Sequence, residues 1–393
     1  MSRLDNCYNI ADLREAARKR LPRGLFEFVD RGVEDEVALA NNLDSFRRIK
    51  LWIRVLIDID AVDLSSTLLG SEVAMPLAIS PTGLAGLCWH EGELALAKAA
   101  AGAGIPYTLA NGSITAMETL AKEAGGRLWF QIYMWREREL TYQVVNRARD
   151  AGFEALLVTV DTGFGGNREY NKRNGFGVPF EFTAKNIPDF VLNPFWVERV
   201  ILRYMLKTGF PRHWNYPEGY QSILAKDGKG KGRTMRGENA TWEDIDKLHA
   251  LWPGKLLVKG ILHPDDAQRA LEHGADGIVI SNHGGRSLDG APAPLDILPA
   301  IVDAVGSRTT IILDSGVRRG SDIVKALALG ADAVMAGRAT LYGIAVGGET
   351  GASHALSLLR KEFRQTMGYA GCLKVDEINR DIIVSPQGSN DFR

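Results

Sequence analysis

Residues 151–160, AGFEALLVTV, contain a pattern that recurs along the whole chain. A helix-like segment ends in glycine, and a run of apolar side chains follows it directly. Glycine suits the left-handed conformation in which helices often end, and a continuous apolar run is typical of a strand buried on both faces of a parallel sheet. The same junction occurs in AGIPYTLA (103–110), HGADGIVI (273–280) and LGADAVMA (329–336). The chain is therefore predicted to consist of repeated strand–helix units.

Eight apolar runs fit such strands, and helical patterns separate them. The predicted strands are 76–80, 106–110, 128–132, 155–160, 255–259, 277–280, 310–314 and 333–336. The predicted helices are 91–103, 114–124, 136–151, 241–252, 264–273, 294–304 and 320–329. Strands and helices that alternate in this number predict a (β/α)8 TIM barrel of the α/β class. A doubly wound sheet is the alternative fold.

Two regions lie outside this alternation. Residues 1–70 contain helical patterns and a strand-like stretch at 49–57, and we expect them to form an N-terminal helical cap. Residues 165–240 form a long insertion after the fourth strand, and a loop of this length is expected to be functional. The expected organisation is a single domain over residues 1–393 that comprises a cap (1–70), a barrel (71–366) and a C-terminal tail (367–393).

The insertion contains an amphipathic pattern that permits two interpretations. NPFWVERVILRYMLK (193–207) places apolar side chains at helical spacing with basic residues between them, and the basic, glycine-rich KDGKGKGRTMR (226–236) follows. The apolar stripe comprises Trp196, Val197, Val200, Ile201, Tyr204 and Met205. Such a helix is suited to an anionic membrane surface, with contact through 187–207. In the other interpretation, a lid or a contact between subunits buries the same stripe.

The composition limits the classes of function and the expected location. Lys+Arg 47 against Asp+Glu 48 gives a formal net charge of -1, whereas nucleic-acid binders need a basic excess. The three cysteines, Cys7, Cys88 and Cys372, form no CxxC pair, so neither a disulfide framework nor a zinc site is indicated. The sequence has no apolar signal-peptide core and no apolar run long enough to span a bilayer. We expect a cytoplasmic protein, peripheral on the inner face of the membrane if 187–207 binds lipid.

Polar side chains and glycines follow nearly every predicted strand, at the end where barrel enzymes carry their active sites. In strand order these residues are Pro81, Thr82 and Gly83; Gln131 and Tyr133; Thr159 and Asp161; Lys259; Ser281, His283 and Arg286; Asp314, Gly316 and Arg318; and Gly337 and Arg338. The last two groups follow strands seven and eight, where barrels commonly bind a phosphate. No GxGxxG motif follows a strand, so a Rossmann NAD site is not expected. FMN, pyridoxal phosphate and a phosphorylated substrate all fit this pattern.

Several motifs resemble those of the FMN-dependent 2-hydroxy acid dehydrogenases and oxidases. They are PTG (81–83), WFQIY (129–133), TVDT (159–162), LLVKG (256–260), SNHGGRSLDG (281–290), DSGVRRGSDIVKALALGADAV (314–334) and GRATLYG (337–343). The resemblance covers nearly the whole chain and is strongest to the (S)-mandelate dehydrogenases, followed by bacterial L-lactate dehydrogenases. It implies FMN-dependent oxidation of (S)-mandelate, or of another (S)-2-hydroxy acid with an aromatic or bulky side chain, to the 2-oxo acid. L-lactate is the alternative substrate, and a non-redox barrel enzyme acting on a phosphorylated substrate is the alternative of another class.

The resemblance also implies a role for each candidate residue. His283 would take the hydroxyl proton of the substrate, and Asp161 would stabilise the resulting imidazolium. Arg168 and Arg286 would bind the substrate carboxylate, and Tyr133 would hydrogen-bond the substrate. Lys259 would lie by the flavin N1 and favour the anionic reduced ring. Gln131, Thr159 and Ser281 would contact the polar edge of the ring. The flavin N5 would lie beside Pro81, Thr82 and Gly83, and the ribityl chain and phosphate beside Asp314, Gly316, Arg318, Gly337 and Arg338.

Some positions depart from the family pattern. Phe26 stands where a tyrosine of an LPKMVYDY-like segment would bind the substrate carboxylate, so one hydroxyl contact is missing. Ala110 replaces a serine that would contact the flavin, and Gly112 replaces a bulky tryptophan of the glycolate oxidases. The space at Gly112 favours an aromatic or long substrate side chain. Gly83, where oxidases often have alanine, favours a dehydrogenase.

The expected partners are few. Oxygen and a quinone both remain possible electron acceptors, and we expect a homo-oligomer, specifically a tetramer. The six other histidines are expected to be exposed or structural; they are His90, His213, His249, His263, His273 and His354.

Overall fold

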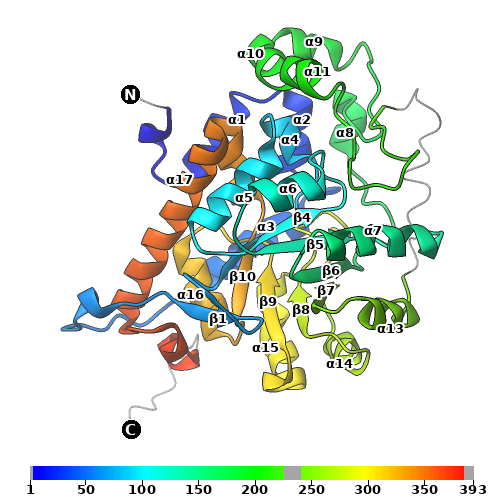
Figure 1. Cartoon of the computed structure of the whole chain (residues 1–393). Helices are drawn as coiled ribbons and strands as arrows, with labels where there is room; N and C mark the ends of the chain where they lie inside the picture. Colours follow the sequence, from blue (N-terminus) through cyan, green and yellow to red (C-terminus); the bar gives the residue numbers. More distant parts are fainter. Residues whose placement is uncertain (1–2, 225–239, 385–393) are drawn as a thin grey trace.

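The computed structural model describes residues 3–224 and 240–384, and its centre is a closed barrel of eight parallel strands (Figure 1). Around the barrel the strands follow the order β10, β3, β4, β5, β6, β7, β8, β9. Their bounds are β3 (Leu77–Ile79), β4 (Tyr107–Ala110), β5 (Leu128–Ile132), β6 (Ala155–Thr159), β7 (Lys255–Ile261), β8 (Gly277–Ile280), β9 (Thr310–Asp314) and β10 (Ala333–Ala336). All eight predicted strands are present. The last strand pairs with the first, so the barrel is confirmed and the doubly wound alternative is wrong.

A helix follows each strand and packs outside the barrel. The helices are α5 (Gly92–Gly102), α6 (Met117–Glu123), α7 (Arg138–Asp150), α13 (Trp242–Leu251), α14 (Pro264–Glu272), α15 (Pro294–Val305), α16 (Gly320–Ala328) and α17 (Arg338–Ala370). Local sequence explains several helix starts. Pro264 and Pro294 begin α14 and α15. The backbone N–H at the first position of a helix has no intrahelical partner, so proline, which lacks this N–H, costs no hydrogen bond there. Helix α17 is interrupted at Gly347 and Gly348, and it continues past residue 367, where the tail was expected to begin.

A short antiparallel hairpin, which the sequence analysis did not predict, closes the N-terminal end of the barrel. It consists of β1 (Ser66–Leu68) and β2 (Ser71–Val73). Arg127, which directly precedes β5, donates to the carbonyl oxygens of Leu68 (3.0 Å) and Ser71 (3.4 Å). The hairpin packs on the apolar side chains that fill the barrel: Ala78, Trp129, Ala155, Leu157, Leu257, Val279, Ile312, Ala333 and Met335. Only the opposite, C-terminal end of the barrel is therefore available for a site of the usual kind.

The N-terminal cap reaches this C-terminal end. It contains α1 (Ile10–Arg18), α2 (Arg23–Asp30) and α3 (Val37–Arg48). Asp289, in the loop after β8, accepts hydrogen bonds from the backbone N–H groups of Asp35 and Ala38 and so holds the start of α3. The prediction of a strand at 49–57 is wrong. This stretch forms one isolated bridge, between Leu51 and Ile383, because no neighbouring strand pairs with the remaining residues.

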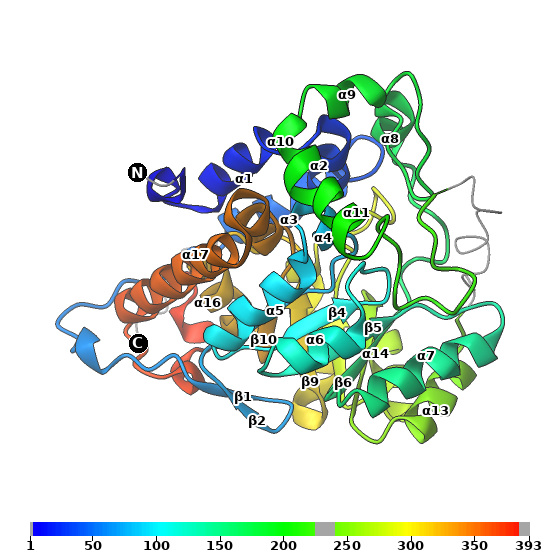
Figure 2. The ribbon, with the colours of Figure 1, turned by 45° about the horizontal axis from the view of Figure 1, so that its top comes forward.

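The insertion lies over α2 and α4 (Ala85–Cys88), and Figures 1 and 2 show its helices in green. It comprises α8 (Glu169–Asn174), α9 (Ile187–Val191), α10 (Pro194–Trp196), a π-helical turn (Val197–Leu202) and α11 (Arg203–Lys207). The predicted apolar stripe is only partly exposed, because Trp196, Val200 and Tyr204 are buried against the body. The exposed apolar side chains of these helices share only Met205 with that stripe, and we call them the outer apolar face: Ile187, Val191, Leu192, Phe195, Leu202, Met205 and Leu206. The basic stretch 226–236 lies outside the described residues.

Candidate active site

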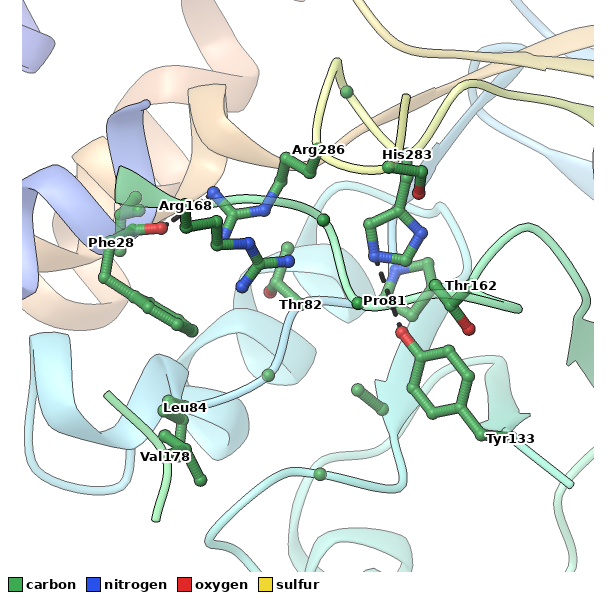
Figure 3. A pocket seen from close by; sticks show the side chains of 18 of the residues that line it. Phe28, Pro81, Thr82, Leu84, Tyr133, Thr162, Arg168, Val178, His283 and Arg286 are labelled. Carbon is green, nitrogen blue, oxygen red and sulfur yellow. Dashed lines mark hydrogen bonds between the residues drawn. The ribbon is translucent and has the colours of Figure 1, made fainter. Parts of the chain in front are cut away.

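A cavity of about 1110 Å³ opens at the C-terminal ends of the strands (Figure 3). Single-ligand pockets usually measure about 300–1,000 Å³, so this one has room for a cofactor and a substrate together. Most predicted site residues line it: Pro81, Thr82, Gly83, Gly112, Gln131, Tyr133, Thr159, Arg168, Lys259, His283, Arg286, Asp314, Gly316, Arg318, Gly337 and Arg338. Asp161, Ser281 and Phe26 are not among its lining residues.

The SNHGGR segment after β8 turns sharply because three consecutive residues have positive φ. These are His283 (57°), Gly284 (68°) and Gly285 (73°). A side chain at Gly285 would also approach the backbone nitrogen of Leu39 to 2.6 Å, so glycine is required there for close packing on α3. The turn directs the imidazole of His283 into the cavity, beside Tyr133 (Figure 3).

His283 is oriented by a carboxylate behind it. Its Nδ1 lies 3.0 Å from Oδ1 of Asp161, whose side chain is 7% exposed. Because a carboxylate accepts, Nδ1 carries the proton, and Nε2 of the neutral ring presents a lone pair. Nε2 lies 3.5 Å from the hydroxyl oxygen of Tyr133. The arrangement is that of a general base whose tautomer is fixed by a carboxylate.

Two guanidinium groups, those of Arg168 and Arg286, lie side by side in the cavity (Figure 3). Arg286 is partly buried, and one of its nitrogens donates to the carbonyl oxygens of Phe28 (2.7 Å) and Arg31 (3.0 Å). Burial and the charge of Arg168 lower the pKa of Arg286 to about 10, so it stays protonated at neutral pH. Within the described part of the chain no carboxylate forms an ion pair with Arg286. Two adjacent cations in a buried site favour an anionic ligand.

The prediction that Phe26 contacts the substrate is wrong, and the cavity residue is Phe28. The Phe28 ring centroid lies 5.6 Å from the guanidinium carbon of Arg168 and 5.1 Å from that of Arg286. Phe26 is buried elsewhere, with Arg14 over its ring. Residues two apart on a helix point to nearly opposite sides, so only one of them can face the cavity. The LPKMVYDY-like segment has tyrosine at both positions, so the segment alone does not distinguish Phe26 from Phe28.

Lys259, at the end of β7, is held in a buried ionic network. Its Nζ donates to Oγ of Ser281 and to Oδ2 of Asp314, both at 2.8 Å. Ser80 donates to the other carboxylate oxygen of Asp314 at 2.8 Å. Burial favours the neutral forms, but mutual attraction outweighs it, so the pKa of Lys259 is raised and that of Asp314 is lowered. Ser281 therefore holds Lys259 and is not among the lining residues of the cavity, and its contact with the flavin ring stays a prediction.

Three buried polar atoms that belong to cavity-lining residues test whether a flavin fits. Oγ1 of Thr82, Nε2 of Gln131 and Oγ1 of Thr159 have no hydrogen-bond partner within the described residues. Buried polar atoms are almost always hydrogen-bonded, so these atoms indicate a polar ligand that completes the site. The edge of an isoalloxazine ring carries both donors and acceptors and would satisfy them. The donor set on this wall therefore fits FMN.

The side chain of Arg338 is engaged in holding the cap. Its guanidinium donates to the carbonyl oxygens of Val29 (3.0 Å), Gly284 (2.8 Å) and Arg31 (3.1 Å). These bonds join the end of α2 to the loop that carries His283. A phosphate near Gly337 would accordingly be bound by backbone N–H groups at the start of α17, with Arg318 on the neighbouring loop.

Comparison with known proteins identifies the family. A family model described as FMN-dependent dehydrogenase matches residues 17–385. The chain belongs to the FMN-dependent dehydrogenases. It is 40% identical to (S)-mandelate dehydrogenase of Pseudomonas putida over 96% of this chain and 94% of that protein. It is 37% identical to L-lactate dehydrogenase of Xanthobacter autotrophicus, over 95% of each chain.

Solved structures agree with this assignment. The crystal structure of the monotopic membrane protein (S)-mandelate dehydrogenase superimposes with a TM-score of 0.90 at 40% identity, covering 96% of this chain and 99% of that one. A mandelate oxidase variant superimposes with a TM-score of 0.79 at 34% identity, covering 98% and 100%. The predicted family and the predicted cofactor, FMN, are thus confirmed.

In this FMN-dependent dehydrogenase, Phe28 and His213 are among the cavity residues that were not predicted from the sequence. Phe28 was not predicted because the role was assigned to Phe26, two residues before it. His213 was expected to be exposed or structural, yet it lines the cavity and is 4% exposed. Its Nδ1 lies 2.9 Å from the carbonyl oxygen of Gly112, 101 residues away in sequence. A contact between such distant segments leaves no local signal in the sequence.

Proposed function

We propose that this FMN-dependent dehydrogenase oxidises an (S)-2-hydroxy acid with an aromatic or other bulky side chain, (S)-mandelate first among them, to the 2-oxo acid. The observation that carries this proposal is the convergence of His283, Arg168 and Arg286 on one cavity. The cations suit the carboxylate and the imidazole suits the hydroxyl of such an acid. Relatives named for mandelate and for lactate support the substrate class.

The side chains have distinct tasks in this reaction. Arg168 and Arg286 bind the carboxylate and thereby fix C2 and its hydroxyl relative to His283. Nε2 of His283 accepts the hydroxyl proton, and Asp161 stabilises the imidazolium that forms. The Tyr133 hydroxyl, 3.5 Å from Nε2, orients the substrate oxygen. When bound, FMN supplies the acceptor for the hydrogen and two electrons that leave C2.

The cofactor would be held by the wall described above. Thr82, Gln131 and Thr159 would hydrogen-bond the polar edge of the ring, with Lys259 as the nearby cation. Pro81 and Gly83 would pack beside the ring. Backbone N–H groups of Gly316, Gly337 and Arg338 would bind the ribityl chain and phosphate, together with the side chains of Asp314 and Arg318.

Turnover of a panel of acids tests the proposal. Purified enzyme is expected to be yellow and to oxidise (S)-mandelate in preference to L-lactate, with an artificial electron acceptor present. Repeating the assay with oxygen or a soluble quinone as sole acceptor identifies the acceptor class. Preference for L-lactate would contradict the bulky side chain, and a colourless protein that turns over sugar phosphates would contradict the oxidation itself.

Replacing Phe28 with tyrosine is expected to lower KM for the acid by about fivefold, because the new hydroxyl can donate to the carboxylate and such a hydrogen bond contributes about 1 kcal/mol. Steady-state kinetics measure this. Phe26→Tyr is the matched control, since Phe26 does not line the cavity and its variant should leave KM unchanged. Equal effects of the two substitutions would contradict the placement of Phe28.

Replacing Lys259 with methionine is expected to weaken FMN retention and to destabilise the fold by about 3–5 kcal/mol, because Asp314 would remain buried without its cation. Gel filtration followed by flavin absorption measures retention, and denaturant unfolding measures stability. The double variant Lys259→Met with Asp314→Asn should recover part of the stability. No recovery would contradict the ionic pairing.

We also propose that the outer apolar face binds the surface of an anionic membrane. None of the helices in the described residues is long and apolar enough to cross a bilayer. Phe195 and Leu206 are 73% and 86% exposed, and basic residues such as Arg203 and Lys207 alternate with them. A relative is named as a monotopic membrane protein, which supports the proposal.

Vesicle flotation tests membrane binding. The enzyme is expected to float with anionic vesicles, and the double variant Phe195→Ser with Leu206→Ser is expected to lose most of this binding. Leu288→Ser, a control at another exposed apolar residue, should float like the parent. A parent enzyme that stays entirely in the soluble fraction would contradict the proposal.

A homo-oligomer, specifically a tetramer, is a further part of the proposal. A second group of exposed apolar side chains lies on a segment that projects beside α17 (Figure 2) and includes Trp52, Ile53, Val55, Leu56 and Ile59. These side chains are suited to a contact between subunits. Light scattering of the purified enzyme measures the oligomeric state.

A further inference from the structure

The insertion returns to the barrel through His213 and Asn215, which are 4% and 0% exposed. Both side chains bond to the loop between β4 and α6. Nδ2 of Asn215 donates to Oγ of Ser113 (2.7 Å) and to the carbonyl oxygen of Thr115 (2.9 Å), and its Oδ1 accepts from the backbone N–H of Met117 (2.8 Å). Neither residue belongs to the outer apolar face, so this part of the insertion has a separate role.

His213 holds the part of this loop that lies nearest the cavity. Its Nδ1 lies 2.9 Å from the carbonyl oxygen of Gly112. Since a carbonyl oxygen only accepts, Nδ1 carries the proton. The ring stacks on Tyr216, with centroids 4.5 Å apart and planes at 24°. Tyr216 in turn meets the edge of the buried Trp135 ring, at 5.0 Å and 90°. The donor that reaches Gly112 is therefore fixed by aromatic packing.

Gly112 lies close to the loop after β3. A Cβ atom on Gly83 would lie 3.7 Å from the carbonyl oxygen of Gly112. Gly83, Ala110 and Gly112 all line the cavity. An empty apolar space is unfavourable, so loops that line such a space tend to move into it unless other contacts hold them. Here hydrogen bonds from His213 and Asn215 hold the loop that carries Gly112 in place.

We propose that His213 and Asn215 are positioning residues that set the room available to the side chain of the 2-hydroxy acid. The insertion thereby selects substrates with an aryl side chain over those with a methyl group. This inference rests on the proposed oxidation of 2-hydroxy acids. It makes no use of membrane contact, because it concerns the buried side of the insertion.

Three variants of the holoenzyme test this proposal. His213→Phe keeps an aromatic ring against Tyr216 but cannot donate to Gly112. His213→Asn places an amide donor close to the former position of Nδ1. Asn215→Asp keeps an acceptor for Met117 and loses both donated bonds. His263→Phe, at an exposed histidine, is the matched control. The measured quantities are kcat/KM for (S)-mandelate and for L-lactate, and calorimetric binding of phenylglyoxylate, the 2-oxo acid of mandelate.

The expected result is a change in the ratio of the two kcat/KM values. His213→Phe and Asn215→Asp should lower kcat/KM for (S)-mandelate at least tenfold, mainly through KM, and weaken phenylglyoxylate binding similarly. L-lactate should change less than threefold, and His213→Asn should recover most of the mandelate activity. An equal loss for both acids, or no loss for either, would overturn the proposal. Failure of the parent to oxidise any 2-hydroxy acid would instead overturn the proposed function.

Discussion

Replacing His283 with alanine is expected to slow reduction of the flavin by a 2-hydroxy acid about a thousandfold. The imidazole is the group positioned to accept the hydroxyl proton, and general base catalysis contributes about 10²–10⁴-fold. FMN should remain bound, because the lining residues that fit the flavin lie on other strands: Thr82, Gln131 and Thr159. Rapid mixing of the holoenzyme with substrate in the absence of oxygen measures the rate through the loss of visible flavin absorption.

Two further variants make this result specific to proton transfer. Asp161→Asn keeps an oxygen that can accept from Nδ1 but removes the charge that stabilises the imidazolium, so its rate should fall less than that of His283→Ala. His249→Ala, at an exposed histidine, should match the parent. A His283→Ala enzyme whose flavin is reduced as fast as that of the parent would rule out the proposed base.

Replacing Arg286 with methionine is expected to lower kcat/KM for the acid by about 10²–10⁴-fold, mostly through KM. Loss of one partner from a buried ionic contact costs about 3–5 kcal/mol, and the substrate carboxylate is the proposed partner. Arg286→Lys retains a charge but not the planar pair of donors, so it should lie between the methionine variant and the parent.

The stability of the Arg286 variant provides a separate test. Partial burial and repulsion from Arg168 disfavour the charge of Arg286 and lower its pKa. Removal of that charge offsets the loss of the bonds to Phe28 and Arg31, so the melting temperature should change by only a few degrees. A large drop in melting temperature with unchanged KM would assign Arg286 a structural role only.

The barrel could be predicted from the sequence because strands that are buried on both faces have continuous apolar sequences. The same rule located the strand ends, and these bring His283, Lys259 and the two glycines proposed to bind the phosphate, Gly316 and Gly337, to one cavity. The hairpin β1–β2 was not predicted, because its strands are short and do not follow the strand–helix alternation. Residues 49–57 have the side chains of a strand but find no partner strand.

Other predictions were wrong because the residue type alone does not determine which way a side chain points. Phe26 and Phe28 are chemically identical, and only the phase of α2 distinguishes the cavity residue from the core residue. The helices of the insertion are apolar on two sides, so periodicity did not reveal that Trp196 and Tyr204 face the barrel while Phe195 and Leu206 face outward. His213 depends on a contact with a loop about a hundred residues away.

The central claim is that groups in one cavity take the hydroxyl proton of an (S)-2-hydroxy acid and remove a hydride equivalent from its C2. A single turnover of the yellow holoenzyme with (S)-mandelate, without oxygen, tests it most directly. Complete bleaching of the flavin, with one molecule of 2-oxo acid formed per flavin and no reaction with (R)-mandelate, is the predicted result. Flavin absorption that stays unchanged with (S)-mandelate, L-lactate and longer (S)-2-hydroxy acids alike would contradict the claim.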